Sequence, residues 1–369
     1  MRDALAEIAL RIGLFRFTLA PLQPLEVPAV NKGNMLRGGF GHAFRRLCCI
    51  PQCKDARACP LDGSCPYKAV FEPSPPPGAD RLSKNQDIPR PFVFRHPLDI
   101  PPVVAPGLSL AADVALGLSP ARAALKGGAT RTRYQPGERF EFGLVLIGRA
   151  LDFLPYFVLS FRELAGQGLG LNRAVCELEN VTACDFDQSA VASVYQSSDQ
   201  IFHTPAPLDL AAWVERRIRQ LAPSRITVQF LTPTHLTFEG QIVKQPEFHH
   251  LFKRVRDRVN ALSSFYGDGP VDADFKGLGE HAEEVRTVSS KIEWVERFRT
   301  SSKTHQRHEL SGFVGSCTYE FPVSSFEFPV SNRQLLKWLI CGELLHVGKH
   351  AAWGNGWFNI LEARISDGS

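Results

Sequence analysis

Apolar residues alternate with other residues near the start of the chain, over residues 8–19. Side chains two positions apart share one face of a strand, so this pattern predicts a β-strand. Residues 31–47 follow a different period, in which apolar positions recur every three to four residues on one helix face. These positions are Leu36, Phe40, Phe44 and Leu47. The pattern predicts an amphipathic helix with Asn34 as its N-cap.

One order of elements is predicted twice along the chain. After the first strand and helix, the first half continues with a strand at 139–148 and a helix that ends at about residue 164. A glycine loop at 166–170 and a strand at 174–181 follow. The second half gives a strand, a helix, two strands, a helix and a closing strand, at 225–240, 246–266, 287–299, 312–322, 332–345 and 357–365. This β-α-β-β-α-β order is that of the ferredoxin-like unit.

The sequence therefore predicts an α+β fold of two ferredoxin-like domains. They are expected over residues 1–190 and 225–369, joined by a connecting segment at 191–224. The first domain carries a cysteine- and proline-rich insertion at 48–106, and the second carries a glycine-rich loop at 348–356. The length of 369 residues agrees with two domains of roughly 150 residues each.

Composition and charge narrow the class of protein. The net charge of +4 permits a nucleic-acid partner but does not require one. The most apolar stretch, residues 142–161, is interrupted by Arg149, Asp152 and Pro155, which argues against a membrane span. The first residues lack the apolar core of a signal peptide. We expect a soluble cytoplasmic protein, whose cysteines are reduced thiols or metal ligands.

Five of the nine cysteines fall between positions 48 and 65. The expected ligands are Cys49, Cys53, Cys59 and Cys65, with Cys48 as an alternative to Cys49. Four thiolates in a short polar loop suit a tetrahedral zinc ion, which leaves no open position and would be structural. An iron–sulfur cluster uses the same four thiolates. The alternative is a set of unligated thiols.

Three further groups could carry chemistry. His42, Arg45 and Arg46 lie on the helix face away from the apolar stripe, where a histidine beside two guanidiniums suits acid–base work on a phosphate. In the loop 348–356, glycines could bring backbone amides to a phosphate. Residues 291–309 interleave basic and aromatic side chains, as single-stranded RNA binding requires. The alternatives are solvated surface charge for the first and third groups, and an ordinary turn for the loop. No G-x-S-x-G or H-E-x-x-H motif is present.

Four local segments together resemble the CRISPR-associated RAMP superfamily, and within it the cysteine-containing branch of its pre-crRNA processing endoribonucleases. LRGGFGHAFRRL at 36–47, followed by CPYKAVFE at 65–72, is similar to the N-terminal block of that branch. The other segments are FGLVLIGRA with GQGLG, SGFVGSCTYEF at 311–321 and GELLHVGKHAAWGNGW at 342–357. The last resembles the glycine-rich loop that names the superfamily, with His346 where the first glycine of a pair is expected.

The resemblance implies two ferredoxin-like domains and an endoribonuclease reaction that needs no metal ion and no other catalytic cofactor. In that reaction the ribose 2′-hydroxyl attacks the adjacent phosphate of CRISPR repeat RNA, leaving a 2′,3′-cyclic phosphate and a 5′-hydroxyl. It implies that His42 is the general base or the general acid. Arg46 would stabilise the phosphate, with Arg45 or Lys32 as the second choice for that role. His350 is the alternative catalytic residue.

The residues expected to bind RNA are Arg37, Arg297, Arg299, Lys303, Gly348, Lys349, Gly354 and Gly356. For Lys349 and the amides of the three glycines, the alternative is that they pack the domain interface. The expected partners are repeat RNA, crRNA and other CRISPR effector subunits, with no small-molecule substrate and no membrane. Two alternatives remain: a non-catalytic RAMP subunit that binds crRNA in an effector complex, and an unrelated zinc-stabilised structural protein.

Overall fold

The chain is described as two compact units. The computed structural model describes residues 8, 10–50, 53, 65–73, 88–98, 131–221, 224–300, 307–322 and 330–362. The N-terminal unit comprises Leu10–Leu208 with Phe265–Gly267, and the C-terminal unit includes Asp209–Ser264 and continues from Asp268. None of the described helices is both long and apolar enough to cross a bilayer.

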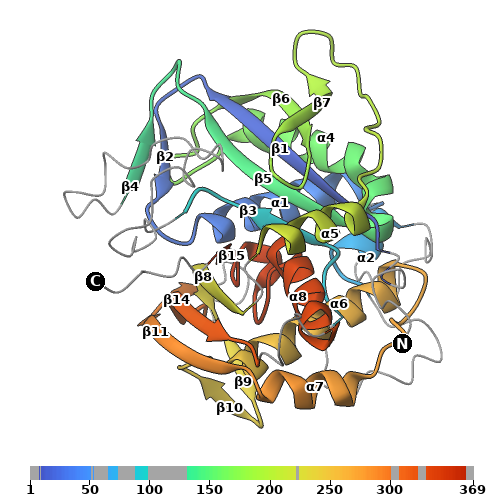
Figure 1. Cartoon of the computed structure of the whole chain (residues 1–369). Coiled ribbons are helices and arrows are strands. Elements are labelled where there is room, and N and C mark those ends of the chain that lie inside the picture. Colours follow the sequence, from blue (N-terminus) through green and yellow to red (C-terminus); the bar gives the residue numbers. More distant parts are fainter. Residues whose placement is uncertain are drawn as a thin grey trace. The chain divides into compact units, whose positions relative to one another are not determined.

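The N-terminal unit is built on a five-stranded antiparallel sheet in the order β3-β5-β1-β6-β7 (Figure 1). The strands are β1 (Ile12–Pro21), β3 (Phe92–Arg95), β5 (Phe140–Ile147), β6 (Cys176–Cys184) and β7 (Ala190–Gln196). Helix α1 (Lys32–Cys48) follows β1, and α4 (Leu154–Gln167) follows β5 after the 3-10 turn η4 (Gly148–Phe153). A strand pair and a short helix complete the unit: β2 (Leu25–Pro28), β4 (Arg131–Tyr134) and α2 (Pro66–Val70). Without β7, this is the ferredoxin-like order.

The C-terminal unit repeats that order in the four-stranded sheet β11-β14-β8-β15. The strands are β8 (Arg225–Thr234), β11 (Arg286–Val295), β14 (Gly312–Glu320) and β15 (Phe358–Glu362). The helices are α5 (Leu210–Gln220), α6 (Phe248–Tyr266), α7 (Phe275–Glu283) and α8 (Val330–Leu345), with the 3-10 turn η5 (Ala351–Trp353). Two small ribbons pair β9 (Leu236–Phe238) with β10 (Gln241–Val243), and β12 (Phe298–Thr300) with β13 (Arg307–Glu309). The predicted α+β fold with ferredoxin-like units is confirmed.

The predicted connecting segment 191–224 contains regular structure. Strand β7 forms the edge of the first sheet, and α5 begins with the Asp209 carboxylate accepting the amide of Ala212 at 2.9 Å. The strand pattern is weak because most of β7 is exposed. The two units meet in sequence between Leu208 and Asp209, inside this segment.

Helix α1 packs against α4 through an aromatic cluster centred on Phe40. Its fully buried ring stacks on Phe157 and Phe161, with centroids 4.7 and 5.4 Å apart. A Cβ at Gly39 would lie 2.8 Å from the side chain of Leu164 on α4, so this glycine lets the helices approach closely. Leu47, expected in the same stripe, is 41% exposed, because the stripe ends with the last turn of α1.

The start of α1 differs from the prediction. The N-cap is Asn31, in the left-handed conformation with φ 62°, and Asn34 lies within the first turn, where its amide donates to the Asn31 carbonyl. An asparagine tolerates this φ better than most residues, which explains why the helix begins earlier than the capping pattern suggested.

Candidate active site and nucleic-acid interface

The candidate catalytic histidine lies on the solvent-facing side of α1. His42 is exposed, while Ala43 and Phe44 next to it are buried against the core. Arg45 and Arg46, three and four positions later, are also exposed and share its side of the helix. The fold therefore presents an imidazole and two guanidiniums together to solvent.

Arg46 is held in place by two side chains of α4. Its Nε donates to Oε1 of Glu163 at 3.0 Å, and a second guanidinium nitrogen donates to the side chain of Gln167. The Gln167 amide in turn donates to Glu163 at 2.7 Å. Sequence reasoning missed both partners, because only the packing of α1 on α4 brings them beside Arg46. The only available signal was the i, i+4 spacing of Glu163 and Gln167 on the second helix.

Two other candidates on α1 have contacts within the N-terminal unit. Lys32 is buried, and its ammonium donates to the carbonyls of Ala29 at 2.8 Å and Leu98 at 3.4 Å. The guanidinium of Arg37 lies over the ring of Phe71, 4.6 Å from its centroid. The structure thus separates buried Lys32 from the exposed group of His42.

Three of the described cysteines gather where α1 ends and α2 begins. Burial, and then the neighbouring thiols of Cys49 and Cys65, raise the pKa of Cys48 to about 12. Cys65 is buried and forms the N-cap of α2, and Cys53 is half-buried. Cys59 lies outside the described residues, as does most of the predicted insertion 48–106. Burial of this kind favours the protonated thiol, and the described cysteines do not bring three sulfur atoms within 4.8 Å of one another.

The glycine-rich loop uses its backbone to hold the C-terminal unit together. The amides of Gly354 and Gly356 donate to the carbonyls of Ala351 at 2.9 Å and Pro233 at 3.1 Å, and the Lys349 amide donates to His235 at 3.1 Å. These three donors are occupied within the fold. The expectation that Gly354 and Gly356 offer their amides to RNA therefore does not fit this conformation.

His346, which stands where a glycine was expected, adopts a glycine-like conformation. Its φ is 60°, and its fully buried ring stacks on Trp357 with centroids 5.6 Å apart. Histidine is among the residues that tolerate the left-handed region, and the aromatic packing offsets its cost. The backbone at residue 346 therefore keeps the conformation that a glycine would adopt, although a histidine stands there.

Basic side chains stack on aromatic rings beside the loop. Arg299 lies 4.0 Å from the ring centroid of Trp353, and Arg307 lies 3.7 Å from that of Phe298. Arg297 is half-buried, the side chain of Lys349 is exposed, and Gly348 has a φ of 82°. Lys303 lies outside the described residues. Planar guanidinium–aromatic pairs resemble the surfaces on which proteins stack nucleobases.

His350 lies in the same loop, next to the ring of Trp353, and its side chain is poorly hydrated. Its Nε2 contacts the carbonyl of Glu309 at 3.0 Å. Its pKa is lowered to about 4, mainly by burial and in part by the nearby charges of His235, Arg299 and Lys349, while the hydrogen bond to Glu309 opposes the lowering. At neutral pH this histidine is therefore uncharged.

The lowered pKa of His350 predicts a loss of stability in acid. The unfolded histidine takes up its proton near pH 6.5 and the folded one only near pH 4, so the stability present above pH 6.5 is lost as pH falls through this window. His350→Asn removes the titration and tolerates the φ of 63°. We expect a smaller fall of the urea midpoint between pH 7 and pH 4 than in wild type. The exposed His203 provides the control: His203→Asn should keep the wild-type fall. An unchanged acid loss in His350→Asn would contradict this assignment.

Comparison with known proteins identifies the family. A family model described as an N-terminal domain (AF_1859_N) matches residues 10–207, and the model of the CRISPR-associated endoribonuclease Cas6 matches residues 228–358. The chain therefore belongs to the family of the AF_1859_N N-terminal domain and carries a Cas6 domain after it, which together support a CRISPR pre-crRNA processing protein with the RAMP fold. This confirms the predicted superfamily; the matches do not bear on its cysteine-containing branch. No curated protein matches the chain.

Solved structures of Cas6 proteins share the fold. A product complex of Thermus thermophilus Cas6 (TTHB231) superposes with a TM-score of 0.50 at 14% identity, covering 95% of this chain and 99% of that one. The Cas6-containing chain of a partial Cas6-RT-Cas1–Cas2 complex gives 0.51 at 13% identity, covering 96% of this chain and 46% of that one. At such low identity the likeness concerns the fold and does not transfer individual residues.

Proposed function

We propose that this protein cleaves CRISPR repeat RNA without a metal ion. The observation that carries the proposal is the exposed group of His42, Arg45 and Arg46 on the first helix of a ferredoxin-like unit, with Arg46 fixed by α4. A positioned imidazole beside guanidiniums supplies the acid–base and electrostatic functions that RNA transesterification needs.

In the proposed step, the ribose 2′-oxygen attacks the adjacent phosphorus as its proton passes to a base. The bond from phosphorus to the 5′-oxygen breaks, and that oxygen takes a proton from an acid. The products are a 2′,3′-cyclic phosphate and a 5′-hydroxyl, with no change in oxidation state. His42 acts as the base or the acid, and Arg46, with Arg45, offsets the charge that develops on the phosphorane oxygens.

Repeat RNA is the proposed partner, held in part by the stacked pairs of the C-terminal unit. Arg299 on Trp353 and Arg307 on Phe298 offer flat cationic surfaces, and Lys349 adds an exposed charge. Arg297, Lys303 and the backbone at Gly348 are the remaining candidates for RNA contact, and Arg37 is the candidate on α1. Other CRISPR proteins are proposed as further partners, as in the complex of a similar chain with Cas1 and Cas2.

The cysteine segment is proposed to hold a structural zinc ion. Its ligands would be Cys49, Cys53, Cys59 and Cys65, with Cys48 as the alternative to Cys49. Support comes from the positions of Cys48 and Cys49 at the end of α1 and of Cys65 at the start of α2, where Cys49 and Cys65 interact electrostatically with Cys48. A closed four-cysteine site would stabilise this connection without taking part in the cleavage.

A cleavage assay in chelator tests the function. The full-length protein, incubated with the end-labelled repeat of its own CRISPR array in excess EDTA, is expected to cut at one position. The upstream product should carry a 2′,3′-cyclic phosphate, detected as resistance to phosphatase until mild acid opens the ring. A scrambled RNA of equal length and composition is the control. Tight binding with no cutting would favour the non-catalytic subunit, and neither binding nor cutting would exclude both.

A further inference from the structure

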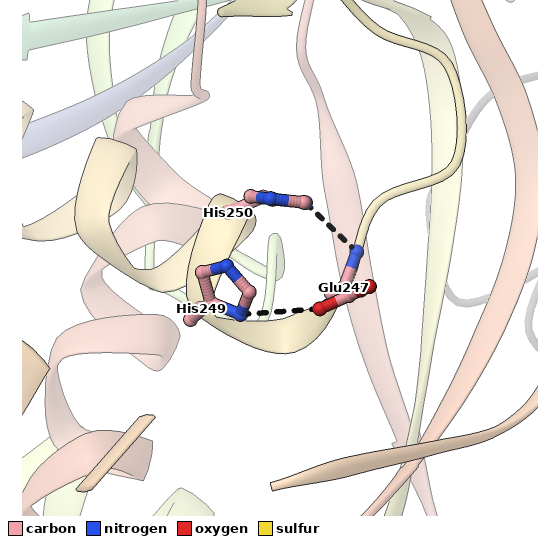
Figure 2. A group of neighbouring side chains, drawn as sticks. All are labelled: Glu247, His249 and His250. Carbon is pink, nitrogen blue, oxygen red and sulfur yellow. Dashed lines mark hydrogen bonds and ion pairs between the residues drawn. The ribbon is translucent and has the colours of Figure 1, made fainter. Parts of the chain in front are cut away.

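A second cluster of reactive side chains lies at the start of α6, in the C-terminal unit. Glu247 precedes the helix, and His249 and His250 occupy its first turn. Figure 2 shows His249 directed at the carboxylate of Glu247 and His250 directed at the backbone nitrogen of the same residue. One ligand atom from each side chain lies within 4.8 Å of the ligand atoms of the other two. Among the described residues, this is the one group of three or more His, Cys, Asp or Glu side chains whose ligand atoms are that close.

We propose that Glu247, His249 and His250 form a binding site for a divalent transition-metal ion, with Zn²⁺ as the test ion. Two imidazoles and one carboxylate are a donor set that zinc accepts, and three protein ligands leave a fourth position for water. This site is separate from the cysteine segment of the N-terminal unit and stands independently of the proposed RNA cleavage.

The distance between two of the donors suits a bridging ion. Nδ1 of His249 lies 3.4 Å from a carboxylate oxygen of Glu247, a separation longer than a strong charge-assisted hydrogen bond. Bonds of about 2.0–2.1 Å in a tetrahedral site place two ligands roughly 3.3–3.4 Å apart. The pair is therefore spaced as one edge of a zinc tetrahedron, and His250 completes a face by moving inward.

Packing holds the imidazoles near this arrangement. The ring of Phe238 contacts both histidines, with centroids 5.3 Å from His249 and 4.6 Å from His250, and the two imidazoles lie 4.1 Å apart. A hydrophobic ring on one side restricts the side chains and lowers local hydration. Both effects favour coordination over a solvated ion pair.

His250 must give up one hydrogen bond to bind. Its Nδ1 accepts the backbone amide of Glu247 at 3.2 Å, so in the neutral ring the proton lies on Nε2 (Figure 2). Coordination through Nδ1 displaces this amide, and coordination through Nε2 moves the proton to Nδ1. Glu247 is exposed, so water can satisfy the released amide in either case.

The nearby cation is already paired. Lys253, one turn further along α6, has its ammonium 2.5 Å from the carboxylate of Glu283 and 5.4 Å from the ring centroid of Phe238. This ion pair reduces the repulsion that a bound divalent ion would meet, and Glu247 supplies a negative charge within the donor set itself.

Titration calorimetry with ZnCl₂ tests the site on the full chain after removal of metal with EDTA. Every variant keeps its cysteines, so any zinc held by thiolates is common to all. Wild type is expected to bind one more Zn²⁺ per chain than His249→Ala or His250→Ala. The exposed His203, far from the cluster in sequence, gives the matched control His203→Ala, expected to bind as wild type does.

Glu247→Gln keeps the side-chain size and guards against loss of folding in the alanine variants. It is expected to weaken the additional site by about tenfold or more, with an unchanged urea midpoint in metal-free buffer. Equal zinc stoichiometry and affinity in wild type and all three cluster variants would overturn the proposal.

Discussion

Replacing His42 with alanine is expected to lower the rate of repeat RNA cleavage by about 10²–10⁴-fold. In the proposed mechanism the exposed imidazole of α1 transfers the proton, because the guanidiniums of Arg45 and Arg46 next to it cannot be deprotonated near neutral pH. The measurement is the single-turnover rate with saturating protein and labelled repeat RNA in EDTA. RNA affinity should change little, since the substitution removes one exposed side chain.

The control for this experiment is His203→Ala, which removes an exposed histidine from the same unit. Its cleavage rate should equal that of wild type. A wild-type rate in His42→Ala would remove His42 from the reaction and direct attention to His350. A loss of RNA binding equal to the loss of rate would instead assign His42 to substrate binding.

Replacing Gly356 with alanine is expected to destabilise the C-terminal unit by about 2–5 kcal/mol. The φ of Gly356 is 70°, and an added Cβ would lie 1.7 Å from the carbonyl oxygen of Val347, so backbone must move. The movement would disturb the bond from the Gly356 amide to Pro233 and the return bond from Val347 to Gly356. Urea unfolding followed by tryptophan fluorescence measures the change.

Gly240→Ala separates steric contact from backbone strain. Gly240 has a φ of 78° and no atom within 4 Å of an added Cβ, so only the left-handed conformation is penalised, by about 1–2 kcal/mol. Equal losses in the two variants would show that conformation alone, and not the approach to Val347, explains the glycine at 356. A Gly356→Ala variant as stable as wild type would contradict the structural role of the loop.

The periodic elements were predictable because their packing partners are regular. Helix α6 buries one face along its length and β5 begins with alternating buried and half-buried residues, and such a burial pattern leaves a repeated sequence pattern. β1 and α8 are buried on almost every side, so the sequence located them without giving their full burial. β3 was missed because its four residues, Phe92–Arg95, are all buried and leave no alternation. Its proline-rich surroundings favour an irregular segment, and only the hydrogen bonds to β5 make it a strand.

The candidate sites divide in the same way. The exposure of His42 and its two arginines followed from the apolar stripe on the opposite face of α1. The burial of Lys32 could not be predicted, because its ammonium donates to the carbonyls of Ala29 and Leu98, and Leu98 is distant in sequence. The cluster of Glu247, His249 and His250 is contiguous in sequence, but adjacent histidines converge only because the chain turns into α6 under Phe238.

The sequence by itself determined the fold class, most of the ferredoxin-like order and the exposed face of α1, because periodicity and spacing are local properties of the chain. Strand β3 and the elements β7 and α5 came only from the structure. The tertiary structure decided how the polar groups are used. In it the amides of Gly354 and Gly356 donate hydrogen bonds to the carbonyls of Ala351 and Pro233, and Arg46 lies beside Glu163. Hydrogen bonds and ion pairs form between atoms that meet only after the helices and sheets have packed, so no local pattern encodes them.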